Sequence, residues 1–137
     1  MPALLDTGFL YATVDAADKN HTRVIQALAA LDDVVLLPSL VLVETSYLLQ
    51  ARLGHAAMRQ FIQRLETSPI PFVSIVHEDL PRIHELLEQY ADLELDLVDA
   101  AIVTLAERLN IRRILTLDQR DFRTVRPRHC DYFEIVP

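Results

Sequence analysis

Glycine and cysteine are scarce in this sequence. Among 137 residues there are two glycines and no low-complexity segment, so no linker is visible and we expect one domain spanning residues 1–137. A single cysteine, Cys130, leaves no partner for an internal disulfide, which favours a reducing, cytoplasmic environment. No secretory signal is visible, and no apolar run approaches the roughly 20 residues that span a bilayer. These absences predict a cytoplasmic protein with no membrane partner.

Signatures of several catalytic classes are absent as well. The five histidines form no i, i+4 pair and no HExxH or Cys/His array, which argues against a zinc site. There is no GxxxxGK[ST] or GxGxxG loop to hold a nucleotide. No serine or cysteine stands in a nucleophile-elbow motif.

Strand-like runs alternate with helix-like runs, which is typical of an α/β domain with a parallel sheet. Asn20 and Ser39 are predicted to cap the second and third helices, and Gly54 to separate the third from the fourth. The predicted strands span residues 3–5, 34–37, 71–75, 113–117 and 131–136, and the predicted helices span 7–14, 21–31, 40–52, 55–66, 78–90 and 97–110.

Four acids stand where an apolar run is interrupted, begins or ends. Asp6 follows the first strand, Glu44 lies inside an apolar helical run, Asp99 begins another, and Asp118 follows the strand at 113–117. An unpaired buried carboxylate is costly, and no basic residue stands beside the apolar runs of Asp6, Glu44 or Asp99. A hard divalent ion, Mg²⁺ or Mn²⁺, would satisfy all four acids together. We therefore predict that these acids bind a metal and are catalytic.

Each of these acids also has a structural interpretation. Glu44 shares a helical face with apolar residues, including Tyr47, but it could lie at the edge of that face with its tip in water. Asp96 and Asp99 have the spacing of an N-cap and the third helical residue, so Asp96 is predicted to cap the helix or to support the ligands from outside. Asp118 stands in a turn, where aspartate is common.

Three further residues near the strand ends complete the set of candidates. Asp121 is three residues further from its strand than Asp118 and is the weaker ligand candidate. The hydroxyls of Thr7 and Thr116 could orient water or a ligand carboxylate. Because ligands bind outside the carboxyl ends of parallel strands, Asp6 and Asp118 can meet only if the first and fourth strands are neighbours.

The charge distribution is uneven. A net charge of −7 argues globally against a nucleic-acid partner. Residues 108–128, however, contain seven arginines and two acids, a basic tract beside an acidic site, as a phosphodiesterase would need. The alternative is a solvated charged face. The arginines predicted to contact RNA are Arg112, Arg113, Arg120 and Arg123.

The ordered set of acidic motifs resembles the PIN-domain ribonucleases, and within them the toxins of VapBC type II toxin–antitoxin systems. The segment Leu5-Asp6-Thr7-Gly8-Phe9-Leu10 resembles the first motif and Val43-Glu44 the second. Asp96-Leu97-Val98-Asp99 resembles the third motif, and Leu115-Thr116-Leu117-Asp118 the fourth.

This resemblance implies a Rossmann-like, three-layer α/β sandwich with about five parallel strands. It also implies a homodimer, a cognate antitoxin and Mg²⁺- or Mn²⁺-dependent RNA cleavage by Asp6, Glu44, Asp99 and Asp118. Two other functions stay open. One is a catalytically weak PIN module that binds RNA or protein, and the other is a Mg²⁺-dependent phosphohydrolase, although the second aspartate of a DxD pair is missing after Asp6.

Overall fold

A computed structural model describes all 137 residues and contains one parallel sheet of five strands, ordered β3-β2-β1-β4-β5. Leu4 pairs with Leu36 of β2 on one side and with Ile114 of β4 on the other. The prediction that the first and fourth strands are neighbours is therefore confirmed. The strands are β1 (Ala3–Leu5), β2 (Val35–Pro38), β3 (Phe72–Val73), β4 (Arg113–Leu115) and β5 (Glu134–Val136).

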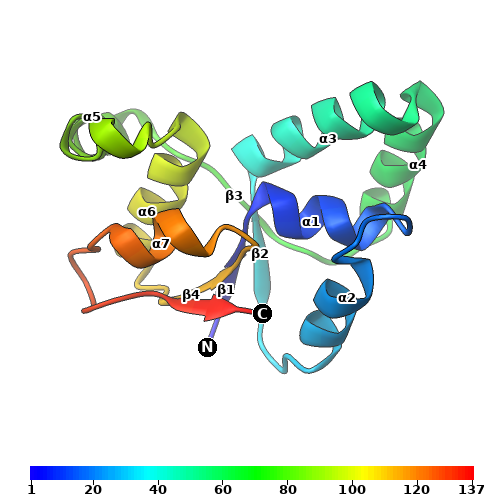
Figure 1. The fold of residues 1–137 in the computed structure, drawn as a ribbon, viewed down its shortest axis with the longest axis horizontal. Helices are drawn as coiled ribbons and strands as arrows, with labels where there is room; N and C mark the ends of the chain where they lie inside the picture. Colours follow the sequence, from blue (N-terminus) through cyan, green and yellow to red (C-terminus); the bar gives the residue numbers. More distant parts are fainter.

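Seven helices flank this sheet in two groups. Figure 1 shows α1 to α4 gathered on one side of the strands and α5 to α7 on the other, which confirms the predicted three-layer α/β arrangement. No helix has the length and apolar character to span a bilayer. The helices are α1 (Thr7–Val14), α2 (His21–Ala29), α3 (Ser39–Leu53), α4 (His55–Glu66), α5 (Leu80–Gln89), α6 (Leu97–Leu109) and α7 (Gln119–Thr124), with short 3₁₀ turns η1 (His77–Asp79) and η2 (Ala91–Leu93).

The core lies between the sheet and its helices and consists mainly of aliphatic side chains. The three residues of β1 are fully or almost fully buried because this central strand has a neighbour on each edge and helices on both faces. Helix α6 is buried over eight consecutive residues, from Asp99 to Ala106. The core thus extends to the first turn of α6, where it encloses the acidic residue Asp99.

Strand order reverses between β1 and β4, which are adjacent although most of the chain separates them. In open parallel sheets, ligands bind beyond the carboxyl ends of the strands at such a reversal. The connections after β1 and β4 carry Asp6 and Asp118. The topology therefore brings the two predicted strand-end acids to one place.

Of the two predicted helix caps, one has the predicted position but no capping hydrogen bond, and the other is wrong. Asn20 is the N-cap residue of α2, but its side chain makes no capping hydrogen bond. Ser39 is already the first residue of α3, after Pro38 at the N-cap position, and the Ser39 hydroxyl hydrogen-bonds the Ser74 hydroxyl at 2.7 Å. Gly54 does separate α3 from α4, with a φ of 95° that favours glycine.

Candidate active site

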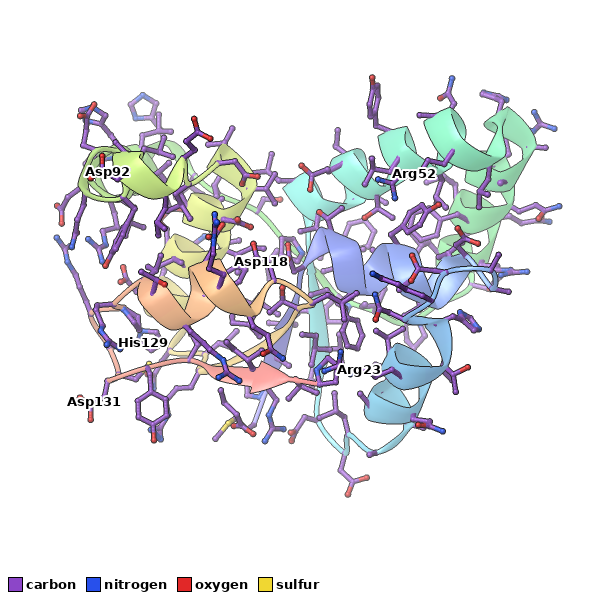
Figure 2. All side chains as sticks on the ribbon, in the orientation of Figure 1. Arg23, Arg52, Asp92, Asp118, His129 and Asp131 are labelled. Carbon is purple, nitrogen blue, oxygen red and sulfur yellow. The ribbon has the colours of Figure 1, made fainter.

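The four predicted acids lie around one cavity of about 390 Å³ at the carboxyl ends of β1 and β4. Figure 2 shows Asp118 near the middle of the molecule, in the loop that leads into α7. The cavity wall contains no lysine and no arginine. The residues that line it are Asp6, Thr7, Gly8, Glu44, Leu48, Asp96, Asp99, Leu117 and Asp118.

Asp6 is the most firmly held of these acids. It is 6% exposed, and its N–H donates to the Leu115 carbonyl at 2.9 Å, which ties the ends of β1 and β4 together. Its carboxylate accepts hydrogen bonds from the Thr7 N–H at 2.8 Å and from the Thr116 hydroxyl at 2.7 Å. These bonds fix the carboxylate at the entrance to α1.

The Thr116 hydroxyl joins two acids that come from different strands. It donates to Asp6 and accepts the N–H of Asp118 at 2.9 Å. Thr116 is fully buried, so this hydroxyl has no competing water. Thr116 therefore orients Asp6 and the backbone of Asp118 together.

Two pairs of aspartates use the same capping geometry. Asp96 caps α6 and accepts the N–H of Asp99 at 2.8 Å, and Asp118 caps α7 and accepts the N–H of Asp121 at 3.1 Å. The predicted cap at Asp96 is confirmed, and its side chain is exposed. In each pair the cap fixes the first helical turn, so the aspartate three residues later has a defined position.

Glu44 reaches the cavity from the edge of the buried face of α3. Its helical neighbours Val41 and Thr45 are fully buried, whereas Glu44 itself is half-buried. Tyr47, expected on the inward face, is 73% exposed, so that part of the prediction is wrong. The carboxylate of Glu44 can therefore face the cavity while it keeps contact with water.

Asp121 belongs to the cluster more closely than the sequence indicated. One carboxylate oxygen from each of Asp99, Asp118 and Asp121 lies within 4.8 Å of the others. From the sequence, Asp121 was expected to be the weaker ligand candidate because it lies three residues further from the strand end than Asp118. Helix α7 instead brings Asp121 back toward Asp118 and Asp99. The sequence signal for this position was the three-residue spacing of Asp118 and Asp121, which equals the spacing of Asp96 and Asp99.

The pKa values of these acids reflect burial without a cationic partner. Burial raises the pKa of the Asp99 carboxyl from 3.8 to about 9, and the neighbouring acids, Asp6 first, add to the increase. Burial also raises the pKa of Asp6 to about 6, although the hydrogen bonds from Thr116 and Thr7 act to lower it. Burial is the main cause of the raised pKa of Asp118 as well. A cation at this site would relieve all three effects.

The donor set fits a hard divalent ion. No ion pair in the protein involves Asp6, Glu44, Asp99 or Asp118, and the cavity wall offers oxygen ligands without cysteine or histidine. Carboxylate oxygens suit Mg²⁺ and Mn²⁺ better than zinc or copper. The residues present therefore match the metal that the sequence predicted.

The four candidate arginines do not lie together in the structure. Arg120 pairs with Asp121 at 3.2 Å and is 74% exposed on α7, close to the acids. Arg112 directly precedes β4 and Arg113 begins it, at the amino end of the strand, whereas the cavity lies at the carboxyl end. Arg113 pairs there with Asp33 and Glu134. Arg123 lines a separate cavity beside β5, so of the four only Arg120 has a contact with the acidic cluster.

Comparisons with known proteins identify relatives of this chain. The profile of the PIN domain matches residues 3–126. Ribonuclease VapC26 of Mycobacterium tuberculosis (strain ATCC 25618 / H37Rv) is 29% identical over 134 residues, which cover 98% of this chain and 99% of that protein.

Two solved structures share the fold. The crystal structure of Mycobacterium tuberculosis VapC20, a sarcin-ricin loop cleaving toxin, has a TM-score of 0.78 at 24% identity and covers 86% of this chain and 91% of that chain. VapBC2 from Rickettsia felis, bound to a promoter DNA fragment, has a TM-score of 0.71 at 18% identity over 100% of both chains. With its fold, its acidic cavity and a profile match over nearly its whole length, this chain belongs to the PIN-domain family.

Proposed function

We propose that this protein is a Mg²⁺- or Mn²⁺-dependent endoribonuclease, the toxin of a VapBC-type toxin–antitoxin system. One observation carries the proposal: four acids from separate segments line one cavity in which they meet no basic side chain. The relative named Ribonuclease VapC26 supports RNA as the substrate. The fold shared with VapBC2 and with a toxin–antitoxin complex from Klebsiella pneumoniae supports a cognate antitoxin.

Asp6, Glu44, Asp99 and Asp118 would hold the metal, with Asp96, Thr7 and Thr116 around them. When bound, the ion lowers the pKa of water at the site and offsets charge on the phosphate. Thr116 keeps the Asp6 carboxylate in one orientation through its 2.7 Å hydrogen bond. Burial and the neighbouring acids raise the pKa of Asp99 to about 9, so this carboxyl would give up a proton if the cluster held a cation.

Outside the cavity, the exposed side chain of Arg120 is in a position to reach phosphates of an RNA that approaches over α7. The protein is proposed to act in the cytoplasm as a homodimer and to be inhibited by its antitoxin. In this proposal the acids cleave RNA, and the basic surface around Arg120 attracts it to an otherwise acidic protein.

Cleavage of a labelled RNA by the purified protein tests this proposal. Activity is expected in Mg²⁺ or Mn²⁺ and should be lost in EDTA. Asp6→Asn, Glu44→Gln, Asp99→Asn and Asp118→Asn should each abolish or severely reduce cleavage with the fold intact by circular dichroism. Asp96→Asn should reduce cleavage less than these four substitutions, because asparagine also caps helices well.

Three outcomes would contradict the proposal. Full activity in EDTA would exclude a metal-dependent mechanism, and wild-type activity in two or more of the four variants would exclude this site. RNA binding without cleavage would favour a catalytically weak PIN module. Hydrolysis of small phosphoesters in place of RNA would favour a phosphohydrolase.

A further inference from the structure

Helices α1 and α3 pack against each other, and both contribute to the wall of the acidic cavity (Figure 1). Thr7 of α1 and Glu44 and Leu48 of α3 line it. Side chains four residues apart in a helix lie on the same face, one turn further along. Tyr11 follows Thr7 by four residues, and Arg52 follows Leu48 by four. These two side chains therefore come next along the two helices as they leave the cavity.

The Arg52 side chain is held against the ring of Tyr11. Its guanidinium carbon lies 4.9 Å from the centre of that ring, and Figure 2 shows Arg52 on the side of α3 that faces α1. Tyr11 is 4% exposed, and its hydroxyl donates to the Asp15 carboxylate at 2.8 Å, which fixes the ring. A planar guanidinium stacks favourably on an aromatic face. The positive charge of Arg52 therefore has a defined position one turn beyond the cavity wall.

Arg52 is exposed and forms no ion pair. The Asp15 carboxylate instead accepts the Tyr11 hydroxyl and the N–H of Ala17. A guanidinium that stacks on a ring keeps the N–H donors along its edge available to an oxygen ligand. Arg52 thus carries a charge that no acid of the protein pairs with. Five other arginines do pair with acids, namely Arg82, Arg108, Arg113, Arg120 and Arg128.

The stretch of chain around Arg52 is basic within an acidic protein. Residues 45–65 contain three arginines and no acid, whereas the whole chain has a net charge of −7. Of these arginines, Arg52 is the nearest in sequence to Glu44, which lies eight residues earlier on the same helix. Eight residues of α-helix span about 12 Å. A polyanion that is bound at the cavity and follows α1 and α3 therefore brings further phosphates to Arg52.

We infer that Arg52, held by Tyr11, binds a backbone phosphate of the RNA that flanks the cleavage position. This inference rests on the proposed ribonuclease function. The cavity wall has no lysine or arginine, so the cations that bind the flanking phosphates must lie outside it, and Arg52 supplies one on α3. RNA fits this place because a phosphodiester strand puts one charge at the cavity and the next ones along α1 and α3. Arg52 is then a substrate-binding residue, and Tyr11 positions it.

Arg52→Ala and Arg52→Lys test this role in the Asp6→Asn background, which prevents cleavage. The dissociation constant of a labelled single-stranded RNA is measured in Mg²⁺ at several salt concentrations, and the Tm of each variant is measured in parallel. Arg59→Ala is the matched control. Arg59 is an exposed arginine of α4 that also lacks an ion pair, and its guanidinium hydrogen-bonds the His55 ring at 2.6 Å. It lies two residues from the buried Phe61 and hence on the opposite, outward face of its helix.

Arg52→Ala should weaken RNA binding about tenfold, as expected for the loss of hydrogen bonds to a charged group. It should also reduce the salt slope by about 0.7, the value for one phosphate contact on a single strand. Arg52→Lys should keep the salt slope because the charge remains, but it should restore only part of the affinity because lysine lacks the planar, stacked fork. Arg59→Ala should leave both the affinity and the salt slope close to those of the parent.

In otherwise wild-type protein, Arg52→Ala should raise KM for RNA and leave kcat and Mn²⁺ affinity unchanged, because the contact lies away from the reacting atoms.

Three outcomes would overturn the role of Arg52 and leave the proposed ribonuclease intact. Unchanged RNA affinity with a lower Tm in Arg52→Ala would reduce the residue to a structural contact between α3 and α1. Equal losses of RNA affinity in Arg52→Ala and Arg59→Ala would mean a diffuse attraction without a defined contact. A lower kcat at constant KM would show that Arg52 does not act through binding of a flanking phosphate. Absence of any RNA binding or cleavage by the parent protein would refute the proposed function and this inference together.

Discussion

Asp99 is held as a neutral acid because it is 8% exposed and faces other acids and no base. The unfolded chain releases this proton near pH 4, whereas the metal-free folded protein keeps it up to about pH 9. Between these values the folded state binds more protons than the unfolded state, so stability must fall as pH rises. Asp6 adds to the same trend up to about pH 6.

We therefore predict that the metal-free protein is more stable at pH 5 than at pH 9. Asp99→Asn should raise the Tm at pH 9 and flatten this pH dependence, because the neutral amide removes the burial of a charge. Thermal unfolding in EDTA at several pH values measures both effects, with Asp92→Asn at an exposed position away from the cavity as control. Stability independent of pH, or the same slope in Asp99→Asn, would show that Asp99 is not a buried neutral acid.

Thr116 offers a second test at the level of one residue. Thr116→Val removes the hydrogen bonds to Asp6 Oδ2 and to the Asp118 N–H, so these two atoms lose their partner, while Asp6 keeps its bond from the Thr7 N–H. The free energy of unfolding should fall by about 1–3 kcal/mol, and Mn²⁺ affinity should fall about 10- to 100-fold, as for other groups that orient metal ligands.

Calorimetric titration with Mn²⁺ and urea unfolding measure these losses. Thr116→Ser keeps the hydroxyl and should restore most of both quantities. If the Thr116→Val and Thr116→Ser proteins had equal Mn²⁺ affinity, the Thr116 hydroxyl would have no role in orienting Asp6.

The elements differ in how clearly the sequence defined them. The predicted bounds of β1, α1 and α4 agree with the structure to the residue, because apolar runs, capping signals and Gly54 mark both ends. The strand predicted at 71–75 is only Phe72–Val73, an edge strand with Phe72 51% exposed. Helix α7 was not predicted, because six residues are too few for a helical period to be visible.

A network of ion pairs connects α5, α6 and the segment before β5. Arg82 pairs with Glu107 at 2.8 Å, and both side chains are 11% exposed. Arg82→Met should lower the free energy of unfolding by about 2 kcal/mol, since it leaves Glu107 half-buried without its main partner. Urea unfolding measures the change.

Glu88→Gln is the matched control for this network. Its pair with His84 is about three-quarters exposed at both side chains, so the change should be within about 0.5 kcal/mol. Equal effects of the two substitutions would mean that the Arg82–Glu107 pair does not hold α5 against α6.

The whole-molecule arrangement divides an arginine tract that is continuous in sequence. Arg113 lies at the amino end of β4, whereas Arg120 lies on α7, beyond the carboxyl end of that strand. Sequence proximity could not reveal this division, because it depends on where β4 begins and ends. The four acids, in contrast, could be selected from the sequence because each interrupts, begins or ends an apolar run.

Arg120→Ala should weaken RNA binding and reduce its salt slope by about 0.7, the value for one phosphate contact on a single strand. Arg113→Ala should leave the slope unchanged and reduce stability, because it breaks the pairs with Asp33 and Glu134. Titration of labelled RNA at several salt concentrations in the Asp6→Asn background compares the two. A smaller salt slope in Arg113→Ala alone would assign RNA binding to the surface at the amino end of β4.

The proposed activity depends on one property of the site, that acids buried without bases bind a divalent cation together. Titration calorimetry with Mn²⁺ at pH 7, in buffers of different ionisation enthalpy, counts the protons released on binding. Because the pKa of Asp99 is about 9 without metal, wild-type protein should release about one proton per bound ion. Asp99→Asn should bind Mn²⁺ more weakly and release close to none. No Mn²⁺ binding by the wild type, or binding without proton release, would contradict the metal site described here.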